Sequence, residues 1–201
     1  MAIEPPPDSE LFRVLLADLH DELPGRIERQ KLLWRWESDA YAGGQLMIPG
    51  GHTAYMAYVE LRQAFISGYF LSTVLLAQCL VENVLASQIG IDAMSAHIKG
   101  SDHETLRDRP TAKECIAASR RLGVLDATDE VDLFRLAEAR NSLAHFRPVS
   151  DATNLDRRSI NERRHAELVC SDDARFAMNV VVRIMAKPAF LLGGETTGYT
   201  E

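Results

Sequence analysis

The segment FLSTVLLAQCLVENVLASQI, residues 70–89, decides the class of fold because it is apolar on nearly every side of a helix. A helix that is apolar all round belongs in the middle of a bundle. Its longest apolar run, from Val74 to Leu85, is interrupted by Gln78 and Glu82. We therefore expect a buried core helix, because this run is too short and too polar for the ~20 residues of a membrane span.

Helical periodicity continues on both sides of this central segment. Apolar residues at i, i+3 and i+4 spacing predict helices over about 53–67, 111–122, 129–145 and 171–191. Residues 90–110 are polar, so we expect a loop there with at most one helical turn, and residues 149–169 read as irregular or partly helical. No strand-like alternation occurs. The sequence predicts an all-α bundle of four to five helices.

A helical extension precedes this bundle. Apolar periodicity predicts two short helices over about 10–22 and 26–37, separated by Pro24-Gly25. Five glycines and prolines within residues 42–52 predict a linker, and we expect the extension to pack on the bundle unless it extends a dimer interface or meets a partner. The predicted units are an extension with disordered first residues over 1–50, the bundle over 51–192 and a flexible tail over 193–201.

The composition is that of a soluble globular protein. Of 201 residues, 46% are apolar and 25% are charged, and the net charge of -7 means that any nucleic-acid contact needs a local basic patch. The N-terminus lacks the basic-then-apolar order of a secretion signal. Three cysteines without CxxC spacing are typical of reduced thiols. We expect a cytoplasmic protein with no membrane association, no cofactor and no bound metal.

Two charges fall at positions that helical geometry predicts to be buried. Arg140 lies near the middle of the apolar stripe of the 129–145 helix, and a guanidinium cannot lose its charge, so it needs a carboxylate partner or a cleft. Glu82 lies inside the central apolar helix, where an isolated carboxylate would be neutralised or strongly destabilising. We therefore expect Glu82 and Arg140 to face each other, directly or across a small polar pocket.

Asn141 and His145 are i,i+4 neighbours on a face beside the Arg140 stripe. The cluster combines a permanent cation, an amide and an imidazole, a group that ordinarily titrates near neutrality. An arginine stabilises phosphorane-like charge, and a histidine transfers a proton at a ribose 2′-hydroxyl or a leaving oxygen. Two structural interpretations compete, namely a helix-end histidine that only complements the helix dipole and an arginine in a structural ion pair.

Arginines gather around this run. Residues 135–165 hold seven arginines against four carboxylates, a local excess of +3. An RNA cleft needs such a patch, so we predict RNA contacts from four of these side chains. They are Arg135, Arg147, Arg157 and Arg158. The alternative is a solvated segment whose charges pair with one another.

The order Arg140-Asn141-x-x-x-His145 resembles the Rx4–6H motif of HEPN domains, in which a polar residue commonly follows the arginine. The surroundings agree over residues 53–192, where a helix pair carrying Glu82 precedes the motif helix and an amphipathic helix closes the chain. The resemblance implies an HEPN-like helical bundle that dimerises with two motifs meeting in a cleft. Many such domains are metal-independent endoribonucleases, often toxins or other agents of defence and stress.

Carried over, the resemblance implies that Arg140 and His145 are catalytic, that Asn141 supports them and that Glu82 orients the arginine. It predicts an endoribonuclease acting through 2′-hydroxyl attack, as a homodimer, with an antitoxin or other protein as a candidate partner. The alternative is a non-catalytic module that binds RNA, a nucleotide or a partner protein. One toxin subgroup extends the motif to HxY, but Phe146 and Arg147 follow the histidine here, so regulation through that tyrosine is not available.

Overall fold

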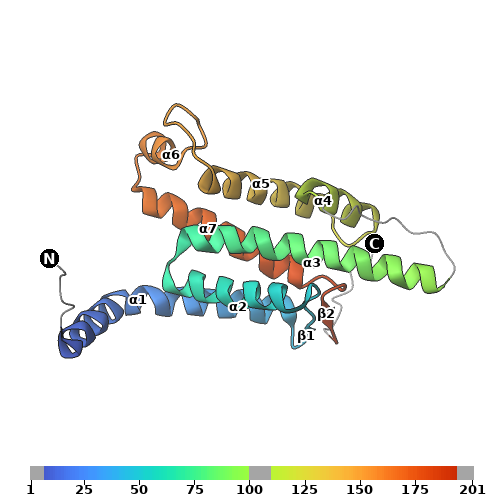
Figure 1. The fold of residues 1–201 in the computed structure, drawn as a ribbon, viewed down its shortest axis with the longest axis horizontal. Helices are drawn as coiled ribbons and strands as arrows, with labels where there is room; N and C mark the ends of the chain where they lie inside the picture. The colour runs from blue at the N-terminus through green and yellow to red at the C-terminus, as the bar shows by residue number, and fades with distance from the viewer. Residues whose placement is uncertain (1–6, 100–109, 194–201) are drawn as a thin grey trace.

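The computed structural model describes residues 7–99 and 110–193, and within them the chain is almost entirely α-helical (Figure 1). The predicted all-α class is confirmed. The disorder predicted for the first residues, the flexible tail beyond Gly193 and most of the second half of the 90–110 loop lie outside the described residues. The elements in chain order are α1 (Asp8–Tyr41), β1 (Gln45–Leu46), α2 (Gly51–Ser67), α3 (Phe70–Ile98), α4 (Ala112–Arg121), α5 (Ala127–Ala144), α6 (Leu155–Glu162), α7 (Ala166–Met185) and β2 (Leu191–Leu192).

Side-chain caps fix where α4 and α5 begin. The Thr111 side chain accepts a hydrogen bond from the Glu114 N–H, and the Glu114 carboxylate accepts one from the Thr111 N–H. Asp126 and Asp129 form the same reciprocal box at the start of α5, at 2.9 and 3.0 Å. Because these boxes satisfy otherwise unpaired N–H groups, they set the register of both helices, and α5 carries the motif.

The central helix is longer than predicted. α3 continues nine residues past Ile89 to Ile98, so the predicted loop began too early. Residues 90–98 contain no proline and include alanines and a methionine that favour helix. At 29 residues, α3 is long and apolar enough to cross a membrane by length and composition alone. It contacts α2, α4, α5 and α7, however, which is the central position that its apolar circumference predicted.

Figure 1 shows α3 between α2 on one side and the α4–α5 pair on the other, with α7 crossing behind it. The core between these helices includes large side chains that are fully or almost fully buried. Examples are Phe65 from α2, Leu80 from α3, Leu133 from α5 and Met178 from α7. The packing therefore holds α5, and with it the motif, against the central helix.

The N-terminal extension is one helix rather than the two predicted. α1 runs through Pro24, which removes one backbone hydrogen bond, and Figure 1 shows the helix bending in its N-terminal half. Its C-terminal part packs on α2 and α7, with Leu33 fully buried and the Trp36 ring 6.0 Å from that of Phe65. The extension thus shares the hydrophobic core of the bundle through that part alone.

The predicted linker contains a short strand. β1 pairs antiparallel with β2, Gln45 opposite Leu192 and Leu46 opposite Leu191. The expectation of no strands is therefore wrong for these residues, because two-residue strands are too short to show any alternation in the sequence. The pairing ties the start of α2 to the chain that follows α7.

Candidate functional site

The motif occupies the last turn of α5 and the first residue beyond it. α5 ends at Ala144, and His145 has an extended backbone, with its N–H donating to the Asn141 carbonyl at 3.3 Å. The helix ends here because Pro148 follows and extended backbone is favoured before a proline. Arg140, Asn141 and His145 are thus brought together at one helix end, as the spacing predicted.

One hydrogen bond joins two of these side chains. An Nη of Arg140 donates to Oδ1 of Asn141 at 3.1 Å. Arg140 is half-buried, whereas Asn141 and His145 are exposed. Among the residues that the structure describes, the His145 imidazole has no hydrogen-bond or ion-pair partner. The cluster therefore presents a cation held by an amide, with a free imidazole one turn further on.

The predicted direct pair of Glu82 with Arg140 does not form. The Glu82 carboxylate accepts a hydrogen bond at 2.9 Å from Nε2 of Gln78, one turn earlier on α3. No ion pair joins Glu82 to an arginine or lysine within the described part of the chain. Its charge instead acts on Cys115 of α4, whose thiol pKa is raised first by burial and then by Glu82.

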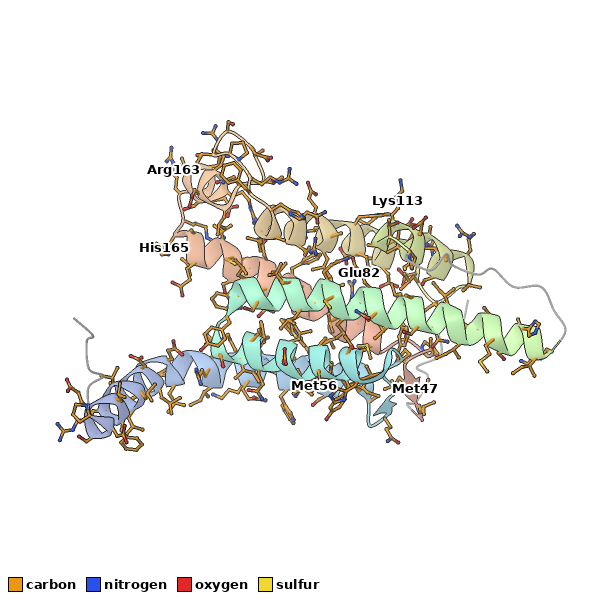
Figure 2. The ribbon with its side chains drawn as sticks, viewed as in Figure 1. Met47, Met56, Glu82, Lys113, Arg163 and His165 are labelled. Atoms are coloured by element: carbon orange, nitrogen blue, oxygen red, sulfur yellow. The ribbon has the colours of Figure 1, made fainter. Side chains whose placement is uncertain are left out.

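The position of Glu82 along α3 explains this difference. The end of α5 lies at the start of α3, since Leu71 lines the same pocket as Leu143 and His145. Glu82 is eleven residues beyond Leu71, which is ~16 Å along the axis at 1.5 Å per residue. Because α3 and α5 run antiparallel (Figure 1), Arg140, four residues before the end of α5, lies ~6 Å closer, which leaves an axial offset of ~10 Å. Figure 2 accordingly places Glu82 near the middle of α3. Within one chain, Glu82 therefore does not orient the arginine of the motif.

His145 lines a surface pocket of about 430 Å³ between the end of α5, the loop after it and the start of α6. Leu71 and Leu155 give the pocket apolar walls, and Asn154 and Asp156 are polar groups along it. Phe146 belongs to the same pocket and is 92% exposed. The site thus places an unpacked aromatic ring next to the imidazole.

The sequence interpretation missed Phe146 as a candidate site residue. The sequence contained an indication of its exposure. Phe146 lies just after the predicted end of the helix and two residues before Pro148, so it does not belong to the buried face of that helix. A phenylalanine with this exposure is a platform on which a flat, apolar ring can stack.

A second pocket of about 280 Å³ adjoins the first, and Ser142 lines both. Arg135, Arg158 and Asp173 contribute to its lining. The Arg135 guanidinium lies 3.9 Å from the centroid of the Phe176 ring, which holds it by a cation–π contact.

Most of the predicted RNA-contacting arginines have partners within the protein. Arg158 donates two hydrogen bonds to the buried Asp173 carboxylate, at 2.6 and 2.8 Å, and this pairing raises the pKa of the arginine. Arg147 forms an ion pair with Asp151 at 3.6 Å. Arg157 is exposed and has no ion pair within the described residues. The patch is therefore less positive than its arginine count implied.

Neither metal nor thiol chemistry has support from the described residues. No group of three or more His, Cys, Asp or Glu side chains among them could hold a metal ion. Burial raises the pKa of the Cys170 thiol to about 11, and Cys115 is likewise buried with a raised pKa. Both thiols are thus protonated at neutral pH and are poor nucleophiles.

Comparison of the chain with protein-family models, with curated proteins and with solved structures found no match.

Proposed function

We propose that this protein is an HEPN-type, metal-independent endoribonuclease whose reaction centre contains Arg140, Asn141 and His145. The observation that carries the proposal is that His145 is exposed on a pocket with an unpacked phenylalanine, while Arg140 and Asn141 form a hydrogen-bonded pair one turn earlier on the same helix. An arginine in a structural ion pair would have a carboxylate partner, and Arg140 has none among the described residues. A histidine held by hydrogen bonds would likewise have partners for its ring nitrogens. Here the imidazole has none among the described residues.

In this proposal a ribose 2′-hydroxyl attacks the adjacent phosphorus, and the P–O bond to the 5′ oxygen of the next nucleotide breaks. The products are a 2′,3′-cyclic phosphate and a 5′-hydroxyl. His145 takes the proton from the 2′-hydroxyl or gives one to the leaving oxygen. Arg140 stabilises the extra negative charge on the phosphorane, and Asn141 holds the guanidinium through the 3.1 Å hydrogen bond.

One imidazole does not serve as base and acid at the same instant, so a homodimer that brings two α5 ends together supplies both groups. The exposed Val149 leaves apolar surface near His145 that such a contact would cover. The HEPN-like bundle, the cytoplasmic location and a role as a toxin or defence protein with an antitoxin partner belong to the same proposal.

A non-catalytic module that binds RNA, a nucleotide or a partner protein is the second candidate. The observation that favours it is that Arg147 and Arg158 each form an ion pair with a carboxylate of the protein. These ion pairs weaken the local attraction for a polyanion. A small binding surface next to Phe146 would suffice for such a module.

RNA cleavage in the presence of EDTA tests the proposal. We expect the wild type to produce cyclic-phosphate and 5′-hydroxyl ends, and His145→Ala to lower the rate by about 10²-fold or more. His52→Ala is the matched control, because His52 is also exposed but lies at the opposite end of the bundle, near the start of α2. Equal cleavage by wild type and His145→Ala would exclude His145 as a catalytic residue, and binding without cleavage would favour the second candidate.

A further inference from the structure

The N-terminal half of α1 carries a concentration of exposed large apolar residues. This segment, residues 8–27, is called the α1 arm. Eight large apolar residues of the arm, from Leu11 to Ile27, are each 42–66% exposed. None of them belongs to the hydrophobic core, whereas Leu33 further along the same helix is fully buried. A surface of this extent on one helix marks an interaction site.

The exposed residues follow the spacing of a coiled-coil seam. Phe12, Leu16, Leu19 and Leu23 are separated by four, three and four residues, which is the alternation of d and a positions over two heptads. Leu15 flanks this seam and widens it. Another helix with the same periodicity is the natural complement, because knobs at a and d insert into holes of a matching helix.

The charges beside the seam favour a second copy of the arm in parallel orientation. In a parallel pair, a g residue faces the e residue five positions later on the other helix. Asp8 occupies g and Arg13 occupies the next e, so each copy would place an acid against a base of the other. Antiparallel pairing would instead place Arg13 beside His20 of the second copy, with no attraction between them.

The charge of the arm argues against other occupants. Residues 8–27 contain five acidic residues and two arginines, a net charge of -3 that disfavours an anionic membrane surface or RNA. The apolar stripe offers on the order of 600 Å² per copy, which approaches the ~800 Å² per partner of a standard protein interface. The area thus suffices for a stable pair of identical arms.

We propose that the α1 arm is a self-association site that forms a parallel helix pair with the arm of a second copy of this chain. Figure 1 shows that the arm projects from the end of the bundle at which α5 terminates. A parallel pair would therefore hold both motif ends on the same side of the assembly. The proposal does not depend on ribonuclease activity, because the arm shares no residue with the motif.

Sedimentation of the full chain tests this inference. We expect Leu16→Glu with Leu19→Glu to weaken self-association by at least 100-fold while the helical circular-dichroism signal stays unchanged. Val14→Glu is the matched control, since Val14 is 54% exposed on the same arm but lies at an f position away from the seam. Equal association of the seam variant and the control would refute the proposal, as would a wild type that stays monomeric at 100 µM.

Charge exchange tests the orientation. Arg13→Glu places two acids together in a parallel pair, so we expect an association about 5-fold weaker. Adding Asp8→Lys reverses both charges and restores association only if the helices are parallel. No recovery in the double variant would overturn the parallel arrangement, and binding of the wild type to vesicles of phosphatidylcholine and phosphatidylglycerol, lost in the seam variant, would assign the arm to a membrane instead. An effect on RNA cleavage is not required by either outcome.

Discussion

Removing the Asp173 carboxylate should be one of the most destabilising single substitutions near the candidate site. Asp173 accepts two short hydrogen bonds from Arg158, at 2.6 and 2.8 Å, and connects α7 to α6. The carboxylate side chain is 10% exposed and that of the arginine 25%. Breaking a fully buried pair costs ~3–5 kcal/mol, and since water reaches the arginine here, we expect Asp173→Asn to cost about 2 kcal/mol.

Chemical denaturation measures the loss in the free energy of unfolding, and thermal unfolding measures the matching change in Tm. A loss of about 2 kcal/mol corresponds to a fall in Tm of roughly 4–8 °C for a domain of this size. The double variant Arg158→Met with Asp173→Leu removes both charges and should recover most of the loss, because no unpaired charge stays in the structure. A change below about 0.5 kcal/mol in Asp173→Asn, or a double variant less stable than the single one, would refute this account.

The same variant reports on function. Asp173→Asn releases Arg158 from its main partner and leaves it only the longer ion pair with Glu162, at 3.9 Å. If the region binds RNA through its arginines, Asp173→Asn should bind a single-stranded oligonucleotide more tightly at low salt than the wild type does. Unchanged affinity and salt dependence would show that Arg158 takes no part in RNA contact even when it is released from Asp173.

Three further predictions concern other parts of the chain. Asp126 accepts a hydrogen bond from Lys187 at 2.9 Å, which lowers its pKa, so its contribution to stability is present at neutral pH and is lost as the pH falls below about 4. Lys187 also pairs with the buried Asp129 at 2.6 Å, so Asp126→Asn, which keeps a side chain that can cap α5, isolates this contribution. We therefore expect thermal melts of Asp126→Asn to lie below the wild type at pH 6 and to converge with it at strongly acidic pH. Phe146→Ala should leave Tm unchanged, since the ring is 92% exposed, but weaken oligonucleotide binding about 5- to 100-fold through lost stacking, while Phe146→Trp retains it. Leu33→Ala should cost about 2–4 kcal/mol in urea unfolding, against less than about 0.5 kcal/mol for the exposed Trp34→Ala.

Apolar periodicity located most of the helices but not their first residues. The capping pairs Thr111 with Glu114 and Asp126 with Asp129, at which the structure starts α4 and α5, fix those starts, and the predicted start at about 129 overlooked the second pair. Such pairs act within one turn, so the sequence alone carries the whole signal. Pro24 shows the limit of this approach, because a proline inside a helix either ends it or bends it, and the outcome depends on the turns that flank it.

The candidate site likewise combines features that local spacing predicts with features that depend on the tertiary structure. Arg140, Asn141 and His145 lie at one helix end because their spacing is local to α5, and their shared role in a site stays a prediction. Phe146 was overlooked although its position beyond the predicted end of the helix separates it from the buried stripe, and only the structure shows that its ring is 92% exposed. The ion pair of Arg158 with Asp173 fits the alternative that the charge pattern left open, in which the arginines of this region pair with carboxylates of the protein.

The failed pairing of Glu82 with Arg140 shows what a helical wheel omits. A wheel gives the angular position of each residue and therefore predicts which face is buried, but it gives no position along the partner helix. Two charges that face the same interface meet only if their axial positions match, and here Arg140, one turn before the end of α5, lies ~10 Å from Glu82 along the axis of α3. Each charged side chain forms a hydrogen bond with a nearby amide instead. Arg140 donates to Asn141, the next residue, and Glu82 accepts from Gln78, one turn earlier. Helical periodicity therefore predicts that a charge on a buried face needs a partner. Which residue becomes that partner depends on the axial offset between the helices.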